Sequence, residues 1–201
     1  NGNIENFGYF DNSLLHIYTY GSITQKLTPD QIKILGGKKE WGITPADPLG
    51  TTVRRISGIG GDRIVIRNRF TYNPNMSPNK SILDNVLRSH VKSFSDRFPM
   101  LKDIKLSQTW GGHLTLSRNK VAAFGELKPG LFSACCQNGL GTVKGTLHGL
   151  AAADLAMGKK TALVKQLLNN PKPKKLPFKP LTKIAVSSRI KLGELLAGKE
   201  L

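Results

Sequence analysis

Apolar and polar residues alternate along several short runs of this chain, as they do in half-buried β-strands. The first run, over 14–20, is rich in β-branched and aromatic residues, which favour strands. Two runs over 53–57 and 63–67 are joined by a glycine-rich loop, which predicts a hairpin. In the second of these runs, Ile64 and Ile66 face one side and the flanking arginines face the other. Further strands are expected over 104–117, 121–124 and 131–135.

Other segments carry the spacing and the end signals of helices. Residues 28–31 form a capping box with proline in the first turn, so a short helix is expected from there to the glycine pair that ends at Gly37. Over 79–97, apolar residues recur every three to four positions, which predicts an amphipathic helix. Its apolar stripe consists of Ile82, Leu83, Val86, Leu87, Val91 and Phe94. Helices are also expected over 142–157 and 182–196, with an extended arm rich in proline and lysine over 171–180 between them.

Composition bounds the class of protein. Of the 201 residues, 39% are apolar, which is enough for one sizeable core or two small ones. No apolar run approaches the ~20 residues that a bilayer span needs, so a transmembrane protein is not expected. No secretory signal is visible at the start, and the adjacent Cys135 and Cys136 cannot build a disulfide scaffold. These observations favour a reducing compartment, and we expect a cytoplasmic protein.

The chain is strongly basic, with 30 Lys and Arg residues against 13 Asp and Glu residues and a formal net charge of +17. An excess of this size is compatible with binding to nucleic acid or another polyanion. The sequence contains no recognition-helix pattern, zinc-ligand spacing or RNA-binding aromatic motif, however. A non-catalytic basic module therefore stays as the alternative function, and nucleic acid is not the partner that we expect.

A glycine-rich turn separates the strand expected over 131–135 from the helix expected over 142–157. It consists of Asn138, Gly139, Leu140, Gly141, Thr142 and Val143. The spacing is one residue too long for the dinucleotide-binding fingerprint, and no parallel strand with an acidic end follows. A helix that starts here presents free backbone N–H groups and can stabilise a negative charge on a ligand. A simple strand–helix junction that needs glycine to turn explains the same residues, and both interpretations stay open at this point.

The helix that follows the turn has small residues at every fourth position, on one face. They are Gly141, Gly145, Gly149 and Ala153. Because each interior glycine costs roughly 1 kcal/mol of helix propensity, we expect another backbone or a flat ligand to approach this face closely. The four histidines show no metal-ligand spacing, so no metal site is expected, and no residue is assigned a catalytic role.

Several blocks of the second half occur in the order of a known family. They are Thr109–Asn119 (TWGGHLTLSRN), Val121–Gly125 (VAAFG), Gly130–Ala134 (GLFSA), Asn138–Thr142 (NGLGT) and Gly149–Gly158 (GLAAADLAMG). This order resembles the closing segment of FAD-dependent oxidoreductases of the D-amino-acid oxidase, glycine oxidase and sarcosine oxidase superfamily. The arm over 171–180 is similar to the tail of gamma-glutamylputrescine oxidoreductase-like members. The match extends over about 109–180 and is looser over 14–70.

The resemblance implies an α+β fold. It implies a mostly antiparallel sheet with flanking helices as substrate-binding domain over 1–108, and strands and a strand–turn–helix returning to the FAD-binding domain over 109–170. Residues 171–201 would form the basic arm and a short C-terminal helix. FAD would lie beside the turn Asn138–Val143, and the substrate-side candidates are Trp110, His113, Arg54 and Arg67.

Departures from the family modify these expectations. Leu114 stands where glycine-oxidase-like members carry a carboxylate-binding arginine, and Val143 where sarcosine-oxidase-like members carry a lysine. An amine or a bulkier substrate is therefore expected instead of a simple α-amino acid, with Arg54, Arg67 or Arg118 as substitute anion ligands. The bent strand has no cysteine after Trp110, so FAD would be bound non-covalently.

The family's N-terminal G-x-G-x-x-G unit is absent from these residues. FAD binding would therefore be incomplete, and we expect the chain to be inactive without a missing N-terminal FAD-binding half, which is its expected partner besides the small-molecule amine. Hydride transfer from the substrate to the flavin is the expected reaction.

Overall fold

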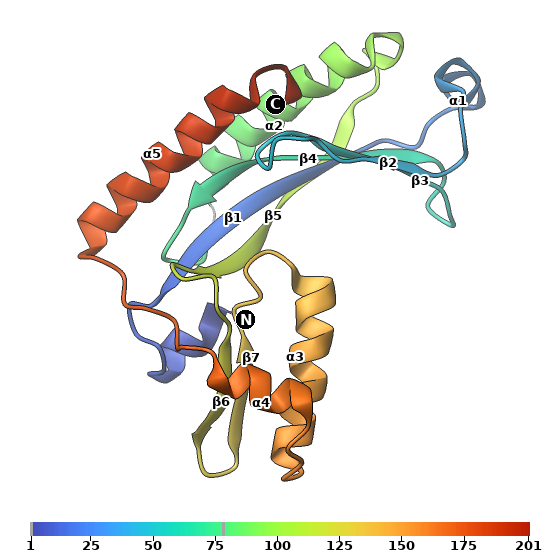
Figure 1. The fold of residues 1–201 in the computed structure, drawn as a ribbon. Coiled ribbons are helices and arrows are strands. Elements are labelled where there is room, and N and C mark those ends of the chain that lie inside the picture. Colours follow the sequence, from blue (N-terminus) through green and yellow to red (C-terminus); the bar gives the residue numbers. More distant parts are fainter. Residues whose placement is uncertain (1, 78) are drawn as a thin grey trace. The chain divides into compact units, whose positions relative to one another are not determined.

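The computed structural model describes residues 2–77 and 79–201 and confirms the α+β class expected from the sequence (Figure 1). The chain forms two compact units, each built from two stretches of sequence. Unit 1 contains residues up to Ile17 and His113–Ile184, and unit 2 contains Tyr18–Gly112 and Ala185–Leu201. Strands β1 (Leu14–Thr24) and β5 (Leu106–Ser117) contribute residues to both units. The division of functions among 1–108, 109–170 and 171–201 stays a prediction.

A five-stranded sheet has the order β2-β3-β4-β1-β5, with β2 (Trp41–Ile43), β3 (Thr52–Ile56) and β4 (Arg63–Tyr72) at one side. Strands β2, β3 and β4 pair antiparallel, and Arg54 lies opposite Val65 while Thr52 lies opposite Arg67. The predicted hairpin is therefore confirmed. Strand β2 was not predicted, because three residues carry too little alternation to identify a strand.

One face of this sheet is covered by α2 (Lys80–Arg97) and the short helix η2 (Pro99–Leu101). The core on this face consists of Leu27, Val53, Ile64, Ile66, Phe94, Phe98 and Leu101. Helix α1 (Pro29–Leu35) begins with the predicted capping box: the Thr28 Oγ1 accepts from the Gln31 N–H at 3.2 Å, and the Gln31 Oε1 accepts from the Thr28 N–H at 2.9 Å.

The predicted apolar stripe of α2 is wrong at one position. Val91 is 47% exposed, whereas His90 and Ser93 are buried beside Phe94. His90 is buried because β1 supplies a polar partner, the hydroxyl of Ser22, at 2.7 Å from its Nδ1. Apolar periodicity cannot reveal a polar residue whose partner lies on a distant strand.

In unit 1, β6 (Ala123–Lys128) and β7 (Leu131–Cys135) form an antiparallel hairpin against which α3 (Gly141–Ala156) packs. Helix α4 (Ala162–Asn169) packs on α3 and β6, and a short helix η1 (Gly2–Phe7) precedes β1. Neither α4 nor η1 was predicted, although Thr161 caps α4 by accepting from the Val164 N–H at 3.3 Å.

The arm that follows α4 is extended, as predicted, and leads to α5 (Lys179–Ala197) and the short helix η3 (Gly198–Glu200). The arm is held in unit 1 by hydrogen bonds to Asn12 and Asn119. The Leu176 N–H donates to the Asn12 carbonyl at 2.7 Å and the Asn12 Nδ2 to the Leu176 carbonyl at 3.0 Å, while the Asn119 Nδ2 donates to the Lys172 carbonyl at 3.0 Å. Within the described residues, no helix has both the length and the apolar character to cross a bilayer.

Candidate functional site

The turn Asn138–Val143 lies in unit 1, between β7 and the N-terminus of α3. The first residue of the turn, Asn138, stabilises the turn through side-chain hydrogen bonds. The Asn138 Oδ1 accepts from the Ser117 N–H at 2.8 Å, while its Nδ2 donates to the carbonyls of Val121 at 3.1 Å and Cys136 at 3.0 Å. Asn138 and Gly139 both have positive φ, 53° and 82°, which asparagine and glycine tolerate best. The turn is therefore held in a defined shape from within unit 1.

The rest of the turn, Gly139 to Val143, is exposed. A Cβ added at Gly139 or Gly141 would meet nothing within 4 Å, and the Leu140 and Val143 side chains are 58% and 66% exposed. Leu140 occupies the N-cap position of α3, and no side chain caps the helix. The exposed N–H groups at this helix end could meet a ligand or water, so the ligand site and the simple junction both stay predictions.

The small-residue face of α3 is not covered by another backbone. A Cβ at Gly149 would meet nothing within 4 Å, and at Gly145 it would meet only the Gln137 side chain at 3.9 Å. The backbone half of the expectation is therefore wrong for the described residues, and the alternative, a flat ligand against this face, stays a prediction. The buried residues of α3 are His148 and Ala151, and burial lowers the pKa of His148.

His113 belongs to a chain of three polar side chains in unit 1. Its Nε2 lies 3.0 Å from the His16 Nδ1, and the His16 Nε2 lies 2.6 Å from the Glu5 Oε2. The other Glu5 oxygen, Oε1, accepts from the backbone N–H groups of Ser13 at 3.0 Å and Leu14 at 3.3 Å. Because a carboxylate only accepts, the His16 Nε2 carries the proton, and His113 donates from its Nε2 when His16 is neutral.

The environment of His113 favours its neutral form. Burial lowers the pKa of His113, and the neighbouring His16 lowers it further. The two rings are stacked, with centroids 5.2 Å apart. His113 was predicted from the family resemblance, whereas His16 and Glu5 were not, because nothing in the local sequence connects them to it.

In unit 2, the face of the sheet opposite α2 carries Arg67, which is half-buried and oriented by hydroxyl groups. Its Nη1 donates to the Thr19 Oγ1 at 3.2 Å and its Nη2 donates to the Thr52 Oγ1 at 3.0 Å. The guanidinium lies 5.7 Å from the centroid of the Phe70 ring. Burial lowers the pKa of Arg67. An arginine held in this way is prepared to bind an anionic or planar group.

Arg54 and Trp110 share this face. Arg54 is exposed and alternates with the buried Val53 and Arg55 along β3. The Trp110 indole lies over Gly21, where an added Cβ would come within 2.8 Å of the ring, and Trp110 is 43% exposed. The structure thus brings three of the four substrate-side candidates to one face of unit 2, while His113 lies in unit 1.

Two further kinds of chemistry-bearing group are the cysteines and the potential metal ligands. Neither Cys135 nor Cys136 forms a disulfide, and burial raises the pKa of Cys136 to about 11, so this thiol is a poor nucleophile. Across residues 2–77 and 79–201, no cluster of three or more His, Cys, Asp or Glu side chains could hold a metal ion.

No protein-family model matches the sequence, and no curated protein matches it. Among solved structures, the fold is similar to glycine oxidase from Geobacillus kaustophilus, at 17% identity and a TM-score of 0.56, over 84% of this chain and 41% of that one. L-amino acid deaminase from Proteus vulgaris, with its specific insertion sequence deleted, matches at 19% identity and a TM-score of 0.48 over 79% and 36% of the two chains. Glycine oxidase from Bacillus cereus ATCC 14579 matches at 18% identity and a TM-score of 0.48 over 79% and 41%. The chain thus spans less than half of each of these proteins, and the first likeness shows a shared fold.

Proposed function

We propose that this chain is the C-terminal portion of an FAD-dependent oxidoreductase that oxidises an amine or amino-acid-like substrate. The observation that carries the proposal is the open, uncapped turn Asn138–Val143 at the N-terminus of α3, at the place where the sequence resemblance puts the flavin. The fold shared with a glycine oxidase supports the same class.

The residues of the turn fit an approaching flavin edge. Gly139 and Gly141 leave room for a flat ring beside the backbone. The Asn138 side chain forms hydrogen bonds with Ser117 and Val121, which hold the turn in its shape. The free N–H groups and the positive end of α3 stabilise negative charge. When bound, the flavin would supply the redox chemistry by accepting hydride from the substrate carbon.

The open face of unit 2 would bind substrate. Arg67, fixed by two hydroxyl groups, would hold an anionic group, Trp110 would supply a flat apolar surface, and Arg54 would attract anions at the edge. Leu114 and Val143 replace the arginine and the lysine of the related enzymes, which supports an amine or a bulkier substrate. The contact between the His16 Nδ1 and the His113 Nε2 fixes the orientation of the His113 ring. His113 would therefore be a positioning residue.

The test uses the longer protein encoded with the upstream sequence, in which we expect a strand followed by G-x-G-x-x-G. Wild-type protein should purify with the visible absorbance of bound flavin. Gly141→Val places a side chain at the open turn and should weaken flavin binding about tenfold or more, equivalent to about 1.4 kcal/mol. Thr146→Val is the control in the same helix, because Thr146 is exposed and does not belong to the small-residue face, and it should leave flavin binding unchanged.

Two results would contradict the proposal: a longer protein that folds but binds no flavin, or equal flavin binding by both variants. The alternative, a basic module, predicts instead that the chain binds DNA tightly and that this affinity falls steeply with salt concentration. Arg67→Met should raise the KM for the amine substrate with little change in flavin content, which separates substrate binding from cofactor binding.

A further inference from the structure

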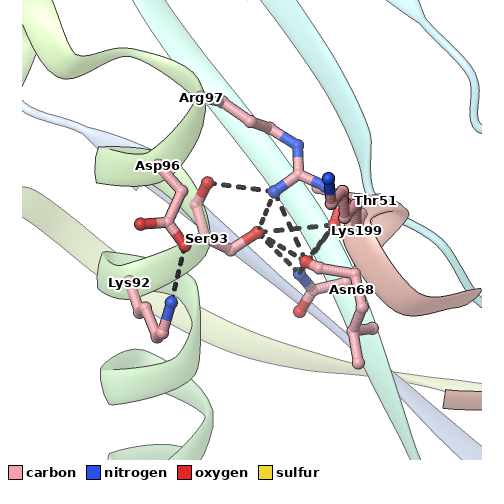
Figure 2. A network of polar contacts seen from close by, with 8 residues as sticks. Thr51, Asn68, Lys92, Ser93, Asp96, Arg97 and Lys199 are labelled. Atoms are coloured by element: carbon pink, nitrogen blue, oxygen red, sulfur yellow. Dashed lines mark hydrogen bonds and ion pairs between the residues drawn. The ribbon is translucent and has the colours of Figure 1, made fainter. Parts of the chain in front are cut away.

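The arginines of unit 2 have different partners on the two faces of the five-stranded sheet. On the face that α2 covers, two arginines are paired with carboxylates: Arg55 with Asp62 at 3.3 Å and Arg69 with Glu194 at 3.0 Å. Arg97 of α2 donates from its Nη1 to the Ser93 carbonyl at 3.0 Å and to the Ser93 hydroxyl at 2.6 Å (Figure 2). These cations therefore have their partners within the fold.

The opposite face of the sheet, the open face, carries arginines without such partners. Arg54, Arg63 and Arg67 alternate with buried residues along β3 and β4, so they share this face. Within residues 2–77 and 79–201, none of the three forms an ion pair. Arg63 donates to two backbone carbonyls, those of Gly60 at 3.1 Å and Thr24 at 3.0 Å, which leaves Arg54 and Arg67 as the cations for a ligand.

One acidic side chain lies near Arg54. Glu40 and Arg54 both line a hollow of about 560 Å³ at β2 and β3, a volume suited to a small molecule. The Glu40 Oε1 accepts from the Ser57 N–H at 3.4 Å, and Glu40 forms no ion pair within the part of the chain that the structure describes. An anionic group on a ligand would therefore be the charged partner that Arg54 lacks.

The guanidinium groups of Arg54 and Arg67 are held apart. Arg67 donates to the Thr19 hydroxyl of β1 at 3.2 Å and to the Thr52 hydroxyl of β3 at 3.0 Å, so its guanidinium lies above β4. The Arg54 side chain runs beside Gly42 of β2, where an added Cβ would come within 3.6 Å of its Cγ and 4.0 Å of its Nε. Neighbouring strands lie about 4.8 Å apart and residues two apart in a strand about 7 Å, so the two groups are separated by about 8–12 Å.

This separation indicates which kind of anion the open face fits. A phosphate is too compact to contact two guanidinium groups that far apart, whereas two carboxylates joined by a short carbon chain contact one each. The carbon chain would find an apolar surface on the same face, because Trp110 lies over Gly21 and is 43% exposed. The two hydroxyl contacts of Arg67 and the Phe70 ring at 5.7 Å restrict its guanidinium before a ligand binds.

We infer that the open face of unit 2 binds a small molecule that carries two separated carboxylates, one on Arg67 and the other on Arg54. The inference rests on the proposed function and specifies its substrate class: an amine or amino acid with two carboxylates. Arg67 would bind the carboxylate that any acidic substrate offers. Arg54 would be the specificity-determining residue, because only a substrate with a second carboxylate reaches it.

The test titrates the chain with three probes by isothermal titration calorimetry. Adipate should bind at least tenfold more tightly than hexanoate, which has the same number of carbon atoms and one carboxylate. It should also bind at least tenfold more tightly than inorganic phosphate, which offers its charge at one point. Equal affinities for adipate and hexanoate would overturn the inference, and phosphate binding as tight as that of adipate would overturn the separation of the two groups.

Two variants assign the two carboxylates. Arg54→Met should reduce the preference for adipate over hexanoate to less than threefold and leave hexanoate binding unchanged, whereas Arg67→Met should weaken both at least fivefold. Arg88→Met is the matched control, because Arg88 is exposed on α2, contacts Asn85 and removes the same charge away from the open face. An Arg54→Met variant that keeps the full preference for adipate, or a control that loses it, would refute the assignment.

The titration needs no flavin, so its outcome is separable from that of the proposed function. If the chain does not fold by itself, the same titrations are made with the longer protein, whose flavin content is measured independently. A flavin-loaded protein without a preference for adipate would refute this inference alone. A preference for adipate in a protein that binds no flavin would contradict the proposed function alone.

Discussion

The acid sensitivity of unit 2 should depend on His90. This side chain is fully buried, its Nδ1 lies 2.7 Å from the Ser22 Oγ, and its Nε2 lies 3.4 Å from the Asn68 carbonyl. Burial lowers the pKa of His90 to about 4, an effect that the hydrogen bond to Asn68 opposes and Arg69 reinforces. The folded protein therefore favours the neutral ring.

The size of the effect follows from linkage. An unfolded histidine has a pKa near 6.5, so between there and the folded value the unfolded state binds more protons. The stabilisation is complete above pH 6.5 and is lost as the pH falls through 6.5 towards 4. Between pH 7 and pH 4 the loss attributable to His90 is about 3 kcal/mol.

The variant His90→Gln keeps a donor and an acceptor but cannot titrate. At pH 7 it should be less stable than the wild type by about 1–3 kcal/mol, because its geometry towards Ser22 and Asn68 is poorer. At pH 4 this difference should shrink by about 3 kcal/mol, so the variant should equal or exceed the wild type.

Denaturant unfolding followed by tryptophan fluorescence reports the stability of unit 2, since both tryptophans, Trp41 and Trp110, belong to that unit. Other groups titrate equally in the two proteins, so the difference between them isolates His90. If both proteins lose the same free energy of unfolding between pH 7 and pH 4, the assignment of acid sensitivity to this buried ring is incorrect.

Three further predictions concern packing, capping and thiol reactivity. Gly21→Ala places a Cβ within 2.8 Å of the Trp110 ring, so it should destabilise unit 2 by about 1–3 kcal/mol and shift the tryptophan emission. Gly58→Ala, with nothing within 4 Å, is the control, and equal stability of the two variants would contradict this packing. Thr28→Ala removes the cap of α1 and should cost about 1 kcal/mol in the same unfolding assay; no change would show that the cap contributes nothing. Cys136 should react with an aromatic disulfide reagent only when the protein unfolds, because it is buried and its pKa is raised to about 11. Rapid modification of both thiols at neutral pH in the folded chain would disprove that burial.

The predictions that succeeded rest on neighbours in sequence. The capping box of α1, its end at Gly36 and the β3–β4 hairpin depend on contacts within a few residues, which a local pattern contains. The turn Asn138–Val143 was identified in the same way, from glycines between a strand and a helix. Its role towards a flavin stays a proposal, because the resemblance and not the local pattern suggested it.

Residues whose roles depend on distant partners were missed. The Ser22 hydroxyl, which is the hydrogen-bond partner of the buried His90, lies 68 positions earlier in the sequence. In the group Glu5, His16 and His113, the contact between the two histidines joins residues 97 positions apart. The sequence placed Val91 on the buried stripe, since nothing nearby signals that a polar ring takes part in the core.

The amino-acid sequence by itself predicted the capping box of α1, the β3–β4 hairpin and the alternation that sends Ile64 and Ile66 to one face of the sheet, because backbone geometry and side-chain period are local properties. The α+β class was expected from the family resemblance. Only the tertiary structure decided that the first and last stretches of the chain are divided between two units, and that Thr51 and Leu201 meet across 150 positions. Such pairings form because buried polar groups need hydrogen-bond partners. Which partners lie within reach depends on the tertiary fold and not on the local sequence.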